Sequence, residues 1–109
     1  MTPRAPYWMD AAAAAEVPEG GVKGVNVLGE PIALFRLEGD VHATSDVCTH
    51  EAALLSEGWV EDGEVICPLH GARFRIRDGA CSGPLGTDLR CYRVRERAGR
   101  VEVALDGTV

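Results

Sequence analysis

Residues 46–74 read DVCTHEAALLSEGWVEDGEVICPLHGARF, and this stretch decides the fold. It contains two short motifs, Cys48-Thr49-His50 and Cys67-Pro68-Leu69-His70, separated by the sixteen residues 51–66. Each motif places one thiol and one imidazole close together on a short segment. Because thiolates and imidazoles are common metal ligands, the two mixed motifs predict a metal centre built from two loops.

Two kinds of metal centre use this donor set. A [2Fe–2S] core has four outer ligand positions, and the Rieske type has two histidines in place of two cysteines on one iron. Tetrahedral zinc also binds two cysteines and two histidines, but zinc fingers usually pair like with like and place the histidines on a helix. Here each motif is mixed and lies in a β-rich pattern, which favours one [2Fe–2S] cluster and leaves zinc as an alternative. Spacing alone does not say which ligand binds which iron.

The sequence around the motifs predicts an all-β fold. Ala72, Phe74 and Ile76 share one strand face, and the arginines between them share the other. The chain has 109 residues with thirteen glycines and six prolines, which favours short strands and turns over a helical bundle. Further strands are expected at residues 22–27, 32–37, 41–44, 92–95 and 101–105, with turns at 29–31, 38–40 and 98–99. Residues 80–82 are expected to begin a partner strand, and residues 7–9 are expected to form an opening strand that leads into a short turn or helical turn. The alanine run at residues 11–15 is ambiguous between strand and helix.

Length and charge limit the classes of function. The chain is expected to form one domain, residues 1–109, and its formal charge is −6. Residues 1–72 hold twelve acids and three bases, a balance of −9, whereas residues 73–109 hold five acids and eight arginines, a balance of +3. This balance argues against nucleic acid as a partner. We find no signal-peptide core and no apolar stretch of membrane-spanning length, so we expect a cytoplasmic protein, in which four cysteines indicate metal more often than disulfides.

The two motifs, taken with their surroundings, resemble the Rieske ferredoxins that serve bacterial aromatic-ring-hydroxylating dioxygenases. The resemblance runs from about Trp8 to Leu105 and rests on Cys-Thr-His, on Cys-Pro-Leu-His-Gly and on four further stretches, residues 31–35, 58–59, 71–74 and 83–85. It implies the Rieske fold of stacked small antiparallel sheets, with a cluster-binding β-subdomain at about residues 46–86 formed by the two ligand loops. It further implies that Cys48 and Cys67 hold one iron, that His50 and His70 hold the outer iron, and that Pro84 covers the cluster.

The same resemblance implies a function. The chain is expected to be a non-catalytic electron carrier and a monomer that takes one electron from a flavin-dependent, NAD(P)H-dependent ferredoxin reductase. It then passes the electron to the Rieske centre of a terminal oxygenase. Two alternatives stay open: the Rieske-like small subunit of an assimilatory nitrite reductase, and a zinc-stabilised interaction module.

Departures from related branches predict the reduction potential. Respiratory Rieske proteins have an additional cysteine in each ligand loop, where this chain has Ala53 and Leu69, and a serine where it has Ala72. Fewer hydrogen bonds to the cluster, together with nearby acids, should lower the potential to about −150 mV, the low end of the Rieske range.

The remaining candidates lie outside the four ligands. The acidic insert, defined as Glu57, Glu61, Asp62 and Glu64, is expected to contribute to docking on a basic partner patch. Trp59 within it is interpreted mainly as a packed loop aromatic. Cys81 and Cys91 are interpreted as small buried or half-buried side chains, and His42 as an ordinary strand residue.

Overall fold

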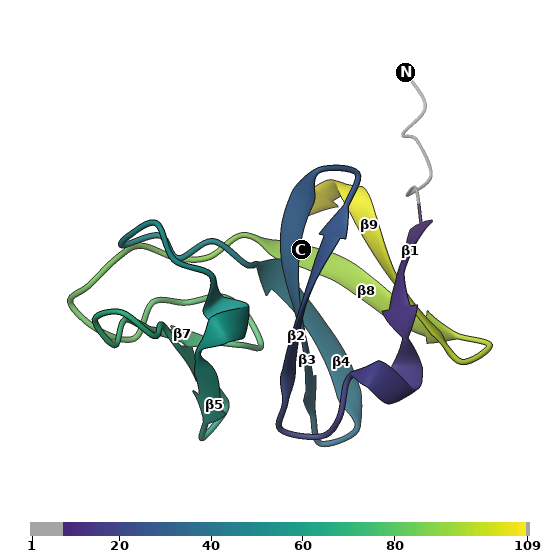
Figure 1. Cartoon of the computed structure of the whole chain (residues 1–109), viewed down its shortest axis with the longest axis horizontal. Coiled ribbons are helices and arrows are strands. Elements are labelled where there is room, and N and C mark those ends of the chain that lie inside the picture. Colours follow the sequence, from purple (N-terminus) through teal and green to yellow (C-terminus); the bar gives the residue numbers. More distant parts are fainter. Residues whose placement is uncertain (1–7, 109) are drawn as a thin grey trace.

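The computed structural model describes residues 8–108 as two antiparallel sheets of different size (Figure 1). The large sheet has six strands in the order β1-β9-β8-β4-β3-β2, and the small sheet has three in the order β5-β6-β7. The elements are β1 (Trp8–Ala13), the 3-10 helix η1 (Ala14–Glu16), β2 (Val22–Val27), β3 (Glu30–Leu37), β4 (Asp40–Ser45), the 3-10 helix η2 (Leu55–Glu57), β5 (Trp59–Glu61), β6 (Glu64–Ile66), β7 (Arg73–Arg75), β8 (Cys91–Arg97) and β9 (Arg100–Thr108). The predicted fold class is therefore confirmed. No helix within residues 8–108 is long and apolar enough to span a membrane.

The large sheet is built from hairpins and encloses its own core. Strand β3 pairs with β2 on one side and with β4 on the other, and β8 pairs with β9. Their alternate residues form one apolar cluster, which includes Ile32, Leu34, Tyr92, Val101 and Val103. Because side chains alternate between the two faces of a strand, these side chains lie on the same face of the sheet, and this face is buried and excludes water.

The small sheet is inserted between two neighbouring strands of the large one. The chain leaves the large sheet at the end of β4, forms β5 to β7, and returns through β8, where Thr44 pairs with Cys91. In Figure 1 this insertion projects to one side of the large sheet. A second apolar cluster joins the two parts, because Phe35 on the other face of β3 packs with Val65 and Phe74 of the small sheet. The cluster also contains Cys48 and Cys67, so the candidate ligands are fixed to the junction of the two sheets.

Three details differ from the sequence prediction. The alanine run extends strand β1 to Ala13 before the single turn of η1, because β1 pairs along β9 with a bulge between Asp10 and Ala12. The turn expected at 29–31 is shorter, since Glu30 and Pro31 already belong to β3. Residues 80–82 form only one isolated bridge, Phe74 with Cys81, and no strand. Tyr7, placed in the opening strand by the sequence, lies outside the described residues.

Candidate metal centre

The first ligand loop begins three residues after β4 and closes on itself. The backbone N–H of Cys48 donates to the carbonyl of Ala53 at 2.9 Å, and Val47 pairs with Leu54 as an isolated bridge. These contacts turn the chain through residues 48–53. Cys48 is 4% exposed, whereas His50 is exposed. The loop therefore directs its thiol inward and carries its imidazole at the surface.

The second ligand loop repeats this arrangement after β6. The N–H of Cys67 donates to the carbonyl of Ala72 at 2.8 Å, the same five-residue closure as in the first loop. Gly71 has φ +78°, a left-handed conformation that favours glycine, and its N–H donates to the Cys67 carbonyl at 3.2 Å. Cys67 is fully buried and His70 is exposed. Two loops of the same geometry thus present the same pair of donors.

The four predicted ligands converge. The donor atoms of Cys48, Cys67 and Glu51 lie within 4.8 Å of one another, and so do those of His50, His70 and Glu51. The two imidazole rings are 6.0 Å apart between centroids, with an angle of 77° between their planes. The two buried thiols therefore form one group and the two exposed imidazoles another, and Glu51 belongs to both. Such a set suits a two-iron cluster with one cysteine-ligated and one histidine-ligated iron.

Glu51 is the residue at this site that the sequence interpretation missed. Its carboxylate accepts hydrogen bonds from the Cys67 thiol at 3.4 Å and from the His70 backbone N–H at 3.2 Å, and it contacts His70 Nδ1. Burial raises the pKa of Glu51, but the hydrogen bonds from Cys67 and His70 outweigh this effect and hold the pKa below its ordinary value. The signal in the sequence was an acid directly after His50, inside a ligand loop.

The Cys67 thiol is protonated at neutral pH when no metal is bound. Burial, the largest effect, raises the pKa of Cys67 to about 11, and hydrogen bonding with Cys48 and Glu51 raises it further. Since a metal binds the thiolate, iron must displace this proton. A buried thiol pair beside an acceptor carboxylate fits a metal centre better than it fits an inert core.

The segment expected to cover the cluster lies beside the first ligand loop. Pro84 is exposed, whereas its neighbour Leu85 is half-buried and packs against the apolar cluster that contains both cysteines. Gly86 also lies close to this loop, because a Cβ built there would lie 3.4 Å from His50 Cβ. The contact of this segment with that apolar cluster therefore comes from Leu85, and the covering role of Pro84 stays a prediction.

The acidic insert is split between the two ends of the small sheet. Glu57 and Trp59 lie near the ligand loops, because Trp59 pairs with Ile66, the residue before Cys67. Glu61 lies at the other end of β5, roughly 7 Å from Trp59 for two strand steps, and Asp62 follows it. Arg73 of β7 pairs with Glu64 at 3.0 Å and with Glu61 at 4.0 Å, so one arginine partly offsets the charge of two of the four acids. Trp59 is 50% exposed and donates to Glu61 at 2.8 Å.

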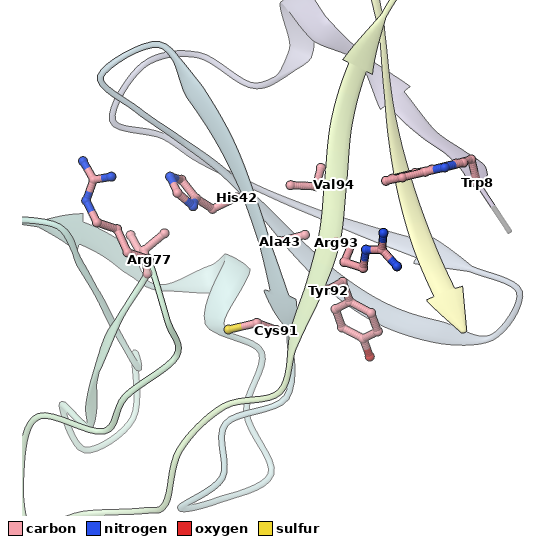
Figure 2. A pocket seen from close by; sticks show the side chains of 9 residues that line it. Trp8, His42, Ala43, Arg77, Cys91, Tyr92, Arg93 and Val94 are labelled. Atoms are coloured by element: carbon pink, nitrogen blue, oxygen red, sulfur yellow. The ribbon is translucent and has the colours of Figure 1, made fainter. Parts of the chain in front are cut away.

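His42 and Cys91 line a groove away from the ligands (Figure 2). Burial lowers the pKa of His42, as does the charge of Arg77, and the buried Nε2 of His42 has no hydrogen-bond partner. Burial also raises the pKa of Cys91. The four cysteines are all free, and Cys81 and Cys91 are half-buried, as the sequence predicted.

The fold and the donor set define the class: an iron–sulfur electron-transfer domain. The sequence profile of the Rieske [2Fe-2S] domain matches residues 7–93. The ferredoxin component of the naphthalene 1,2-dioxygenase/salicylate 5-hydroxylase systems of Ralstonia is 43% identical over 100 residues, which cover 91% of this chain and 96% of that protein.

Two solved structures show the same architecture. A chain from the complex of reduced oxygenase and oxidized ferredoxin in carbazole 1,9a-dioxygenase matches with a TM-score of 0.86 and 32% identity, covering 96% of this chain and 99% of the other. A protein described as an NADH-dependent nitrite reductase small subunit from Mycobacterium tuberculosis matches with a TM-score of 0.82 and 31% identity, covering 93% and 96%. The chain belongs to the Rieske [2Fe-2S] domain family, and its cofactor is a Rieske-type [2Fe–2S] cluster.

Proposed function

We propose that this chain is the ferredoxin component of a ring-hydroxylating dioxygenase system. It accepts one electron from a flavin-containing, NAD(P)H-dependent reductase and delivers it to the Rieske centre of a terminal oxygenase that attacks an aromatic compound. The observation that supports this most directly is the exposure of both candidate imidazoles beside two buried thiols, on a chain that resembles a dioxygenase ferredoxin over 91% of its length.

In this proposal Cys48 and Cys67 hold the inner iron, and His50 and His70 hold the outer one. The cluster supplies the one-electron redox change when bound. The protein supplies orientation, since the paired five-residue closures fix both loops, and it supplies burial on the cysteine side. The side chain of His70 is 66% exposed, so a partner can approach the imidazole end closely, and electron transfer needs that proximity.

Carrying electrons is the whole role of this chain in the proposal. Among the described residues, both groups of potential metal ligands belong to this one centre. His42 is the one histidine left over, and it has no carboxylate partner within hydrogen-bonding distance. We further propose a monomeric, cytoplasmic domain spanning residues 1–109, with a reduction potential of about −150 mV.

Reconstitution tests the proposal. The purified, anaerobically prepared protein should be red-brown, contain iron and acid-labile sulfide, and give a Rieske-type spin resonance signal after reduction. Mixed with NADH, a flavin reductase and a ring-hydroxylating oxygenase, it should support product formation that stops when it is omitted. A colourless protein that binds zinc would contradict the proposal at its first step.

A nitrite reductase small subunit is the second candidate, favoured by the match to such a protein. The presence of all four predicted ligands argues for an electron carrier. The two candidates separate in one assay: a small subunit should co-purify with a nitrite-reducing catalytic subunit and support its activity, and a dioxygenase ferredoxin should do neither.

A further inference from the structure

Thr49 stands between Cys48 and His50 and makes two hydrogen bonds to one distant residue. Its hydroxyl donates to the carbonyl of Thr87 at 2.5 Å and accepts from the N–H of Thr87 at 2.8 Å. A single side chain thus satisfies both backbone groups of a residue that lies 38 positions further along the chain. Only a hydroxyl, which is donor and acceptor at once, can do this from one atom.

The partner residue belongs to the segment that lies over the first ligand loop. We define residues 82–87 as the cover segment. Within it, Gly86 has φ +86°, and a Cβ built there would lie 2.8 Å from the Thr49 hydroxyl and 3.4 Å from the backbone nitrogen of His50. The absence of a side chain at residue 86 is what lets the cover segment approach the loop so closely.

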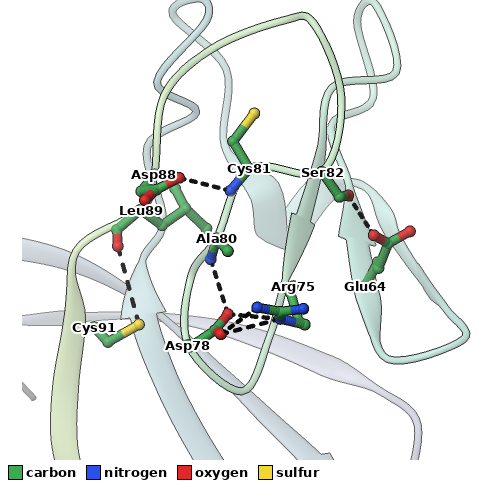
Figure 3. Close-up of polar contacts among 9 residues, drawn as sticks. All are labelled: Glu64, Arg75, Asp78, Ala80, Cys81, Ser82, Asp88, Leu89 and Cys91. Carbon is green, nitrogen blue, oxygen red and sulfur yellow. Dashed lines mark hydrogen bonds and ion pairs between the residues drawn. The ribbon is translucent and has the colours of Figure 1, made fainter.

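The two ends of the cover segment are held by a separate network (Figure 3). The N–H of Cys81 donates to Asp88 at 2.9 Å, Ser82 bonds to Glu64, and the N–H of Leu89 donates to the carbonyl of Gly79 at 2.8 Å. The Cys81 thiol also donates to the carbonyl of Leu85 at 2.9 Å. These contacts close the base of the segment on itself and on the small sheet. None of them reaches the ligand loops.

Within residues 8–108, the hydrogen bonds between the cover segment and the ligand loops are the two made by Thr49. The cover segment contains two glycines, Gly83 and Gly86. Its residues are exposed except for Leu85 and Gly86, which are half-buried. A segment with few buried contacts opens at a low free-energy cost. Its closed position beside His50 therefore depends on the packing of Leu85 and on the hydroxyl of Thr49, which makes both hydrogen bonds.

We propose that Thr49 is a positioning residue whose hydroxyl fastens the cover segment against the His50 side of the metal centre. By holding Thr87 and Gly86 in place, it fixes the first ligand loop beside the imidazole and limits the access of water to it. This inference rests on the proposed ligand set, since it takes His50 as a ligand. It adds a role for a residue that binds no metal itself.

Three substitutions in the holoprotein test the role. Thr49→Val keeps the shape and removes both hydrogen bonds, and Thr49→Ser keeps the hydroxyl. Thr87→Val is the matched control, because the bonds involve only the backbone of Thr87. The first readout is hydrogen–deuterium exchange of peptides covering residues 82–90. The second is the rate at which visible absorbance is lost in the presence of an iron chelator, and the third is the midpoint potential.

We expect Thr49→Val to exchange about tenfold faster at residues 82–90, the effect of losing one or two hydrogen bonds of ordinary net strength. It should also lose its colour faster and show a shifted midpoint potential, whereas Thr49→Ser and Thr87→Val should match the parent protein. Equal exchange and equal bleaching in Thr49→Val and the parent protein would overturn the proposal. An equal effect of Thr87→Val would do the same.

Gly86→Ala provides an independent test if Thr49→Val does not assemble a cluster. Its added methyl group meets the Thr49 hydroxyl and should release the cover segment while both ligand motifs stay unchanged. We expect the same faster exchange at residues 82–90, and unchanged exchange would overturn the proposal. Hydrogen–deuterium exchange does not depend on electron transfer, so it tests the role of Thr49 separately from the proposed function. If the proposed function is wrong, the parent protein should be colourless while residues 82–90 are still protected from exchange.

Discussion

Asp46 connects the metal-binding insertion to the large sheet, and its removal should weaken that connection. Its carboxylate accepts two hydrogen bonds from Ser56, one from the backbone N–H and one from the hydroxyl, both at 2.6 Å. Asp46 itself is 3% exposed. Its carbonyl accepts from the N–H of Leu55 at 2.7 Å, so the residue fastens η2 to the end of β4. Cys48 follows two residues later.

The expected loss of stability follows from these contacts. A hydrogen bond to a charged group contributes about 1.5–3 kcal/mol, and Asp46→Ala removes two of them while leaving both donors of Ser56 without a partner. Ser56 is half-buried, so water can partly replace the carboxylate, and we expect a loss of about 3 kcal/mol. Asp46→Asn keeps one acceptor and the volume, and should lose about 1 kcal/mol. For a domain with a stability of about 5–15 kcal/mol, the alanine variant is strongly weakened.

The measurement is the unfolding rate of the anaerobic holoprotein at a fixed urea concentration. Cluster loss makes unfolding irreversible, so a rate is the meaningful quantity. A loss of about 3 kcal/mol should speed unfolding by about tenfold to a hundredfold, depending on how much of the contact survives in the transition state. Circular dichroism reports the strands, and visible absorbance reports the metal centre.

Asp40→Ala is the control, because Asp40 is exposed and its side chain makes no hydrogen bond to any of residues 8–108. Its unfolding rate should stay close to that of the parent protein, since exposed positions contribute little. An Asp46→Ala rate within twofold of the parent protein would refute the reasoning. So would an asparagine variant as fast as the alanine variant, because the hydrogen bonds would then not be the cause.

Four further predictions concern the site and its surroundings. Cys67→Ser should abolish visible absorbance and bound iron, while His42→Ala should keep both, as measured by absorbance and iron content. Glu51→Gln should raise the midpoint potential by tens of millivolts in a redox titration, because it removes a negative charge beside the ligands. Gly58→Ala should destabilise the fold by more than about 3 kcal/mol in thermal unfolding, because a Cβ there would lie 1.9 Å from the carbonyl oxygen of Ile66. Reversing Glu61 and Asp62 to lysine should slow reduction by the reductase at low salt and weaken its salt dependence; unchanged stopped-flow rates would exclude them from docking.

Much of the fold could be predicted because most strands are encoded by local patterns. Ala72, Phe74 and Ile76 alternate with arginines, and the structure buries all three. The strand at the alanine run could not be predicted in the same way. Alanine has no polar–apolar period to read, and the strand at residues 11–13 forms because β9 offers a partner for pairing. That partner lies almost the whole chain away.

The four candidate ligands could be predicted from spacing, but their surroundings could not. The residue types and the spacing of the two motifs indicate a metal centre without knowledge of the three-dimensional structure. The bonds of Thr49 to Thr87 and of Asp46 to Ser56 join residues 38 and 10 positions apart, and neither pair forms a motif. Such contacts depend on how the insertion folds back on itself, which no local rule specifies.

The contacts of Asp46 and those of Thr49 lie on two different sides of the insertion, the cysteine side and the histidine side, and the two sides differ in burial. On the cysteine side, Cys48 and Cys67 share an apolar cluster with Phe35 of the large sheet, and Asp46 adds charged hydrogen bonds to η2, so this side is costly to open. On the histidine side, His50 and His70 are exposed, and the cover segment is held by the Thr49 hydroxyl and by the packing of Leu85. In the proposed function this asymmetry is useful, because the buried side would retain the iron while the exposed side would meet the reductase and the oxygenase. Strengthening the histidine side with apolar bulk would protect the cluster and, by the same burial, hinder the approach of both partners.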